Sequence, residues 1–191
     1  KTYGNVVALE AASIEMNEGE FLTLLGPSGS GKTTLLMAIA GINNPDSGEI
    51  WIDGKLATYL PPFKRDLGMV FQNYALFPHM TIFDNIAFPL LMRKMDKTLI
   101  RKEIARVLEI VELDYVAKRF PRELSGGQQQ RIALARCIVY KPSIILMDEP
   151  LGALDKKLRG TLQREIKQLH ENLGITVLYV THDQEEAMVM S

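Results

Sequence analysis

A phosphate-loop motif near the start of the chain is the sequence feature that most constrains its fold. The pattern is a glycine followed, after four residues, by Gly-Lys-Ser/Thr, and it requires a strand before the loop and a helix after it. The apolar run 21–25 predicts the buried strand, and residues 32–40 predict the helix whose N-terminus faces an anion. A glycine-rich turn that carries a lysine by chance would lack this context. The motif consists of Gly26, Pro27, Ser28, Gly29, Ser30, Gly31, Lys32 and Thr33.

The residue types of this loop predict a nucleoside triphosphate as the ligand. Glycines let successive backbone N–H groups turn inward around phosphate oxygens. Lys32 is expected to reach the β and γ phosphates, and the hydroxyl of Thr33 is expected to ligate Mg²⁺. Thr34, the next residue of the predicted helix, is assigned to the same nucleotide site.

Length and charge narrow the class of protein further. A chain of 191 residues is long enough for one domain with a substantial core and an inserted lobe. Lysine and arginine number 22 against 23 acidic residues, so no overall basic charge indicates a nucleic-acid partner. The one cysteine, Cys137, lies among apolar residues, which predicts burial and excludes an intramolecular disulfide. The chain lacks an initiating Met and stops within a predicted helix, so we expect a fragment truncated at both ends.

Hydrophobic periodicity predicts an α/β fold with a parallel sheet. The two apolar runs 144–147 and 176–180 bracket an amphipathic helix, and this order is typical of a strand–helix–strand crossover. We expect residues 1–73 and 141–191 to form a catalytic core with an N-terminal antiparallel β subdomain, and residues 74–140 to form an inserted α-helical subdomain. The remaining strands are expected at 2–15, 20–25, 48–54 and 67–71, and the remaining helices at 82–92, 99–111 and 127–140.

Two adjacent carboxylates follow one of these strands. Asp148 and Glu149 come at the C-terminal end of the apolar run 144–147, where open α/β sheets usually bind their ligands. Buried carboxylates without a partner are costly, so a purely structural role is disfavoured. We assign Asp148 to Mg²⁺, and Glu149 to the polarisation of the water that attacks the γ phosphate.

A second glycine-rich turn lies at a predicted helix start, in the segment Leu-Ser-Gly-Gly-Gln at 124–128. It is another potential phosphate-binding helix terminus. One nucleotide does not need two such cradles from a single chain. The candidate binding residues of this turn are Ser125, Gly126, Gly127 and Gln128.

Taken with these motifs, the chain resembles the ATP-binding subunits of ABC transporters over essentially its whole length. The phosphate loop, Asp148-Glu149 and the Leu-Ser-Gly-Gly-Gln signature are joined by three further family motifs, all in the family's order. The resemblance implies a P-loop NTPase core, and ATP and Mg²⁺ as cofactors. The interval between the phosphate loop and the signature leaves no room for the long coiled-coil insertion of related DNA-repair ATPases. The three further motifs are a glutamine loop at Gln72, a D-loop ending at Asp155 and a switch histidine at His182.

The resemblance also assigns roles at these positions. Two subunits of this family stack head to tail, so the signature residues would bind the partner's ATP in trans. Tyr3 would stack on adenine, and Gln72 would contact the metal and the attacking water while its loop faces the membrane subunits. His182 would hold the γ phosphate. The resemblance thus implies catalytic roles for Lys32, Gln72, Glu149 and His182, metal contacts from Thr33, Gln72 and Asp148, and a nucleotide contact from Asp155.

Finer resemblance indicates bacterial importers for polyamines, maltose, sulfate or iron, carried by residues 71–81 and 181–188. It implies a homodimer, transmembrane permease subunits, an indirect role for an external solute-binding protein, no nucleic-acid partner, and a place on the cytoplasmic face of the cell membrane. The alternatives are a soluble ABC-type ATPase acting on nucleic acid or ribosomes, and a nucleotide-gated module that hardly hydrolyses ATP. His79 and His170 lie in no motif and are interpreted as structural.

Overall fold

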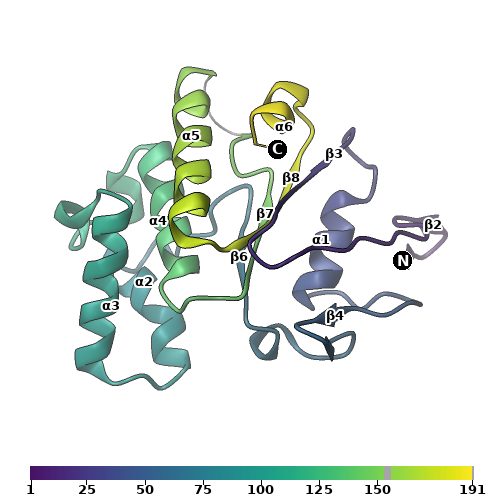
Figure 1. Cartoon of the computed structure of the whole chain (residues 1–191). Coiled ribbons are helices and arrows are strands. Elements are labelled where there is room, and N and C mark those ends of the chain that lie inside the picture. Colours follow the sequence, from purple (N-terminus) through teal and green to yellow (C-terminus); the bar gives the residue numbers. More distant parts are fainter. Residues whose placement is uncertain (153–155, 191) are drawn as a thin grey trace. The chain divides into compact units, whose positions relative to one another are not determined.

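A computed structural model describes residues 1–152 and 156–190 of the chain, without the side chains of residues 156 and 157. These residues form two compact units (Figure 1). The core unit comprises residues 1–69, 143–149 and 163–191, and the helical unit comprises residues 70–142 and 150–162. No helix in the described part is both long and apolar enough to cross a membrane.

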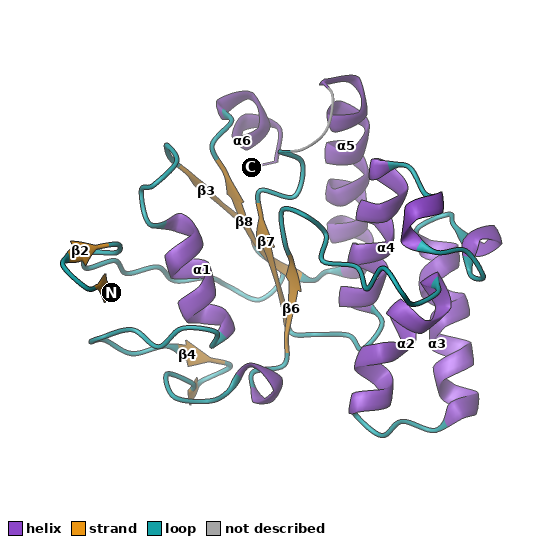
Figure 2. Ribbon diagram, turned by 180° about the vertical axis from the view of Figure 1, so that it is seen from behind, coloured by secondary structure: helices purple, strands orange, loops and turns teal. Residues whose placement is uncertain are grey.

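A parallel sheet runs through the core unit in the order β3-β8-β7-β6 (Figure 2). Both β3 and β7 pair with β8 in parallel register, Leu25 opposite Thr181 and Asp148 opposite Val180. The carboxyl ends of these three strands therefore meet at one edge, which confirms the predicted crossover and α/β class. The four strands are β3 (Phe21–Leu25), β6 (Leu67–Val70), β7 (Ile144–Asp148) and β8 (Thr176–Thr181).

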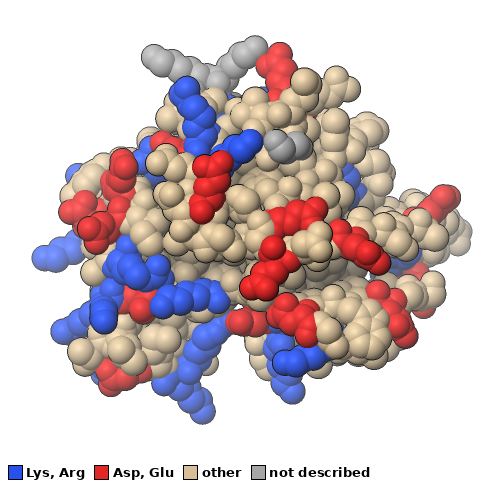
Figure 3. Space-filling view, viewed as in Figure 1, with Lys and Arg blue, Asp and Glu red and all other residues tan. Residues whose placement is uncertain are grey.

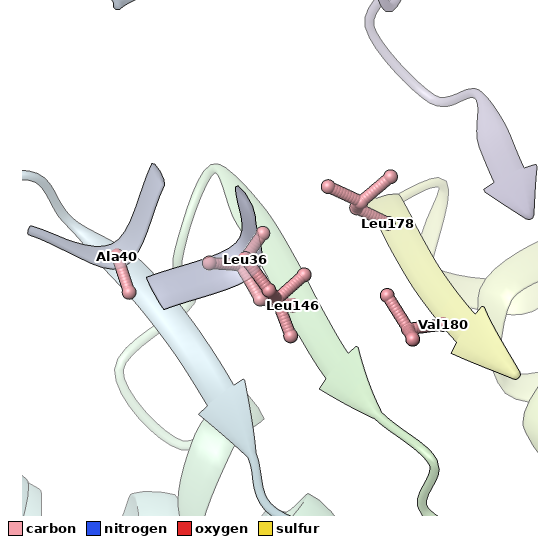
Figure 4. Close-up of a cluster of buried hydrophobic side chains, with 5 residues drawn as sticks. All are labelled: Leu36, Ala40, Leu146, Leu178 and Val180. Atoms are coloured by element: carbon pink, nitrogen blue, oxygen red, sulfur yellow. The ribbon is translucent and has the colours of Figure 1, made fainter. Parts of the chain in front are cut away.

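Helix α1 (Lys32–Ala40) covers one face of this sheet. Leu36 and Ala40 of the helix pack against side chains of β7 and β8 that point toward it (Figure 4). These side chains are Leu146, Leu178 and Val180. Leu36 and Leu146 are fully buried, so replacing either by Ala would cost about 2–5 kcal/mol of stability. This cluster fixes the phosphate loop, which joins β3 to α1, against the strands that carry the acidic residues.

The C-terminal end of α1 is closed by a buried arginine. The guanidinium of Arg65 donates to the carbonyls of Ala38 and Ile39, each at 2.8 Å, and burial lowers its pKa. The negative end of the helix dipole also stabilises a cation at this position. Gly41 follows the helix with φ of 77°, and a Cβ there would lie 2.5 Å from Nε of Arg65, so the position requires glycine.

The antiparallel β subdomain is confirmed, but its strands are much shorter than the sequence predicts. The expected strand over 2–15 is wrong, because the Gly4-Asn5 pair turns the chain and only β1 (Thr2–Tyr3) and β2 (Val6–Val7) pair. The expected strand over 48–54 is a hairpin, because Asp53 and Gly54 both take positive φ between β4 (Trp51–Ile52) and β5 (Lys55–Leu56). A short 3₁₀ turn, η1 (Pro62–Lys64), precedes β6.

The helical unit is built on α2 (Ile82–Met92), α3 (Lys97–Ile110) and α4 (Gly126–Ile138), as predicted to within two residues at each end. Asp96 caps α3 by accepting from the amides of Thr98 and Leu99. Asn85 is fully buried and binds the backbone at Phe77, Met80 and Thr81, which holds the loop before α2. Two 3₁₀ turns, η2 (Asp114–Val116) and η3 (Pro121–Glu123), join α3 to α4.

The crossover between β7 and β8 is α5 (Lys156–Leu173), and α6 (Gln184–Met190) follows β8. His170 lies on α5, where its ring contacts Phe21 edge-on and Nε2 lies 2.9 Å from the carbonyl of Gly19. This placement is structural, as predicted. Cys137 is 4% exposed, which confirms its predicted burial.

Candidate functional site

The phosphate loop spans residues 26–33 between β3 and α1 in the core unit. Gly29 and Gly31 both take positive φ, of 81° and 89°. At Gly31 a Cβ would lie 2.6 Å from the carbonyl oxygen of Ala8, so even a compatible φ would leave no room for a side chain. The glycines therefore allow the loop to curve, and Gly31 also allows residue 8 to pack closely against the loop. The positive end of the α1 dipole is directed at the loop.

The side chain of Lys32 folds back over this loop. Its Nζ donates to the carbonyls of Gly26 at 2.7 Å and Pro27 at 2.8 Å, and lies 3.3 Å from Oγ of Ser30. A phosphate group bound in the loop would be a stronger acceptor than these carbonyls. The Lys32 ammonium is thus held over the loop, within reach of an anion that binds there.

Thr33 and Asp148 meet where the loop faces the end of β7. The hydroxyl of Thr33 donates to Oδ1 of Asp148 at 3.0 Å. Burial raises the pKa of Asp148, with the neighbouring charge of Glu149 adding to the effect, while the Thr33 hydrogen bond and Lys32 oppose it. The exposed Thr33 hydroxyl and the buried Asp148 carboxylate, side by side, form a hard oxygen donor pair of the kind that Mg²⁺ prefers.

Glu149 and His182 form the second contact at this edge of the sheet. Nδ1 of His182 lies 3.0 Å from Oε2 of Glu149, and the Glu149 side chain is only 16% exposed. Glu149 has φ of 44°, which is unusual for a residue with a side chain, and its amide donates to the carbonyl of Val180 at 3.0 Å. Backbone strain held by a neighbouring strand is typical of functional positions.

A buried carboxylate that sequence reasoning missed supports the histidine. Glu186, on α6, is 4% exposed; one of its oxygens accepts from the hydroxyl of Tyr179 at 2.6 Å and the other from Thr181. The Thr181 hydroxyl oxygen also accepts from the amide of Asp183 at 3.1 Å. The turn that carries His182 is therefore fixed on both sides. An acid four residues after a histidine is too common for its spacing alone to predict this role.

The signature turn lies in the helical unit at the start of α4. Ser125 is the N-cap, with Oγ accepting from the amide of Gln128, while Oε1 of Gln128 accepts from the amide of Ser125. Gly127 is buried, and a Cβ there would lie 3.2 Å from Leu158. Ser125 is exposed and Gly126 half-buried, so the first turn of α4 is accessible.

Gln72 lies in the helical unit two residues after the end of β6 and is exposed. The two residues that follow Asn73, Tyr74 and Ala75, both take positive φ, of 60° and 47°. Arg136 of α4 holds this strained turn by donating to the carbonyls of Ala75 at 2.8 Å and Tyr74 at 2.9 Å. The loop after Gln72 and the signature helix are thus tied together within one unit.

Tyr3 is 45% exposed on β1, its hydroxyl accepts from Nδ2 of Asn43 at 2.8 Å, and Nζ of Lys1 lies 5.5 Å from the centroid of its ring. Asp155 lies outside the described residues. The structure brings together Thr33 with Asp148 and Glu149 with His182. Thr34 follows Thr33 on α1 and is half-buried.

Comparison with known proteins identifies relatives of this arrangement. Residues 9–152 match the family model described as "ABC transporter". The chain is 52% identical over 191 residues to the spermidine/putrescine import ATP-binding protein PotA of Legionella pneumophila subsp. pneumophila, covering all of this chain and 52% of the relative. It is also 52% identical to the trehalose/maltose import ATP-binding protein MalK of Thermococcus litoralis, over 100% of this chain and 53% of that one. The chain thus spans about half the length of the curated relatives it matches.

Among solved structures, the chain resembles the dimeric form of the bacterial ABC transporter cassette MJ0796. The TM-score is 0.84 at 38% identity, covering 98% of this chain and 86% of that one. A second structure of that cassette, a dimer described as a post-hydrolysis state bound to ADP and Pi, also has a TM-score of 0.84, at 36% identity over 100% of this chain and 87% of that one.

Proposed function

Because this chain belongs to the ABC transporter family, we propose that it binds and hydrolyses ATP in order to power solute import through partner membrane subunits. The main observation behind the proposal is that two side-chain contacts lie at the carboxyl ends of the neighbouring strands β7 and β8. Thr33 contacts Asp148 and Glu149 contacts His182, and Thr33 itself belongs to the phosphate loop that carries Lys32. Phosphate binding, metal binding and proton transfer would then share one site.

Lys32 and the loop amides would hold the β and γ phosphates, and Tyr3 would stack on the adenine. Glu149 would accept the proton of the attacking water, for which its position beside the phosphate loop is suitable. His182 would stabilise charge on the γ phosphate. Its contact with Glu149 supports an arrangement in which both residues act at the γ phosphate. Gln72 would contribute to the metal and the water, and Asp155 to the nucleotide.

Thr33 and Asp148 would hold Mg²⁺, since a hydroxyl and a carboxylate at 3.0 Å fit that ion. When bound, the metal would neutralise phosphate charge and polarise the γ phosphate. Burial raises the pKa of Asp148 in the absence of a cation, so a cation would relieve an existing electrostatic cost.

The signature residues Ser125, Gly126, Gly127 and Gln128 would bind the ATP held by a second copy of the chain. The accessible first turn of α4 supports this role, as does the description of the similar cassette as a dimer. Head-to-tail closure around two ATP molecules would then be the step that permease subunits convert into transport. A solute-binding protein would act through those permeases, and the site of action would be the cytoplasmic face of the membrane.

Measurement of phosphate release tests the catalytic assignment. Glu149→Gln keeps the side chain's shape but cannot accept a proton, so hydrolysis should fall by at least a hundred-fold while ATP affinity is retained. Glu185→Gln, an exposed change on α6, is the matched control and should leave turnover unchanged. Near-normal hydrolysis by Glu149→Gln would remove the proposed base. Stimulation of turnover by nucleic acid, rather than by reconstituted permeases, would favour the soluble-ATPase alternative.

A further inference from the structure

A basic and apolar tip joins two helices of the helical unit. We define the α2–α3 tip as residues 91–102, which comprise the end of α2, the connecting segment and the first turns of α3. Its one acidic residue, Asp96, is engaged as the N-cap of α3. The basic residues of the tip are Arg93, Lys94, Lys97, Arg101 and Lys102.

Three apolar side chains of the tip are exposed. Met92 is 66% exposed, Leu99 51% and Leu91 49%. Single exposed apolar residues are ordinary, but three within a twelve-residue segment that also contains five lysines and arginines form an amphipathic surface. The buried side of α3 is made by other residues, among them Ile100 and Ile104, so the exposed ones are not needed for the core.

Most cations of the tip keep their charge available. Within the described chain, Lys94, Lys97, Arg101 and Lys102 form no ion pair, whereas Arg93 stacks at 3.9 Å on the ring of Tyr140. The nearest acid along α3, Glu103, is already engaged, since it accepts from Arg106 at 2.7 Å and pairs with Lys141 at 3.7 Å.

The placement of these cations is unfavourable for the isolated helix. The first turn of α3 contains Lys97 and no acidic residue, although the positive end of a helix dipole favours acids. The first turns of α2 and α6 follow the usual preference, with Asp84 in one and Glu185 in the other, whereas α1, α4 and α5 lack an acid there as α3 does. Positive charge collected at a positive helix end is stabilised when an anionic surface approaches it.

Figure 3 shows lysine and arginine side chains gathered at the lower left of the view, where Figure 1 places α2 and α3. We propose that the α2–α3 tip is a membrane-surface contact. Its lysines and arginines would bind the phosphate headgroups of anionic lipids, and Leu91, Met92 and Leu99 would enter the interfacial layer. A polynucleotide would use the cations but not the aliphatic side chains, and the tip has no aromatic residue on which a base could stack.

The proposal concerns lipid rather than nucleotide, so it stands apart from ATP hydrolysis. Co-sedimentation of the 191-residue chain with sucrose-loaded vesicles tests it. Binding to vesicles of equal parts phosphatidylglycerol and phosphatidylcholine is expected at low salt, with little binding to phosphatidylcholine alone. A triple variant, Lys94→Glu, Lys97→Glu and Arg101→Glu, should bind at least roughly a hundred-fold more weakly, because each cation near an anionic surface contributes about a five-fold factor.

A matched control reverses three other exposed charges of the same unit, Lys118→Glu, Arg119→Glu and Arg122→Glu. This control should retain most of the binding. Equal loss in both triple variants would overturn the proposal in favour of a net-charge effect. Absence of binding by the unmodified chain at low salt would overturn it outright.

The aliphatic part of the tip is tested separately by Met92→Ser combined with Leu99→Ser. These exposed changes should not lower the unfolding midpoint, and they should weaken vesicle binding while leaving binding to the polyanion heparin unchanged. Unchanged vesicle binding would overturn membrane insertion and indicate a general anion site.

An environment-sensitive dye on Met92→Cys gives an independent reading, since Cys137 is buried. Its emission should shift to the blue with anionic vesicles, whereas dye on Lys118→Cys should not shift. Equal shifts at the two positions would count against docking by the tip.

Discussion

Asp148 is a residue whose ionised form is unfavourable until a cation binds. It is 8% exposed, and burial raises its pKa above the usual value of 3.8. Because the folded-state pKa is the higher one, the folded protein binds the proton more tightly than the unfolded chain does. Stability is therefore lost as the pH rises from the usual carboxyl pKa through the raised one, and the cost persists at neutral pH.

Asp148→Asn should consequently raise the thermal unfolding midpoint near pH 7 in the absence of nucleotide and metal. The amide oxygen can still accept from the Thr33 hydroxyl, so the packing should be preserved. Scanning calorimetry should find that the gain shrinks as the pH falls toward 3.8, and that Mg²⁺ with ATP stabilises the unmodified protein more than the variant. A lower midpoint for Asp148→Asn at neutral pH would contradict this electrostatic account.

Glu186 is predicted to act on catalysis through His182. Glu186→Gln keeps one acceptor but weakens the bonds from Tyr179 and Thr181, so the His182 turn should loosen and turnover should fall roughly ten-fold. In a His182→Ala background the same change should have no further effect on ATP turnover. Kinetic assays of the four proteins measure this, and a Glu186 effect of equal size in both backgrounds would assign the residue to general stability instead.

Among the elements, helix α4 has a structural role in addition to presenting its exposed first turn. Through Arg136 it holds the strained turn at Tyr74 and Ala75, and the same guanidinium lies 5.4 Å from the centroid of the Phe77 ring. Two residues with side chains at positive φ cost about 1–3 kcal/mol each, so the turn depends on its external partners. Any shift of α4 would therefore be transmitted to the loop that carries Gln72.

Arg136→Ala should lower the free energy of unfolding by about 2–4 kcal/mol, because two charged hydrogen bonds to the turn are lost. Arg136→Lys should be intermediate, since a lysine makes the bonds without the planar fork. Hydrogen exchange should locate the loosening at residues 73–77. As a control, Ala75→Gly relieves the positive φ and should be neutral or stabilising; marked destabilisation by that change would mean that the turn is not strained.

Sequence patterns predicted the helices and the phosphate loop, but they missed one local turn and two side chains whose partners belong to other elements. The phosphate loop and the helix that follows it are recognised from a few neighbouring residues. The expected strand 2–15 was wrong because the turn at Gly4 outweighed β propensity. Arg65 and Glu186 could not be predicted as structural supports, because their partners come from other elements and become neighbours only on folding.

For the whole molecule, the proposed function requires two chains. The phosphate loop belongs to the core unit and the signature turn to the helical unit, and each is a helix N-terminus suited to an anion. Under the proposed function, a second copy would complete each nucleotide site. This arrangement leads to a test by mixed dimers.

Ser125→Arg should leave ATP binding by the monomer nearly unchanged but abolish ATP-driven dimerisation, because bulk and charge would face the partner's nucleotide. A heterodimer with a Lys32→Ala subunit would carry both lesions in one composite site and leave the other intact. Light scattering and phosphate release should therefore show partial recovery in the mixture. Loss of ATP binding by folded Ser125→Arg monomer would instead place the signature on the nucleotide of its own chain.

The sheet order also determines when the phosphate loop can form during synthesis. The hydrogen bond from Gly19 to Thr176 spans 157 positions, and β3 pairs with β8 alone among the described strands. At about 5–20 residues per second, a ribosome would need roughly 8 to 30 seconds to make the intervening chain. The helical segment 70–142 is contiguous and can pack during that interval. When residues 1–150 have emerged from a stalled ribosome and β8 has not, protease should therefore spare the helical segment and cut near residues 19–31. The nucleotide-binding loop would then be among the last parts of the nascent chain to become ordered.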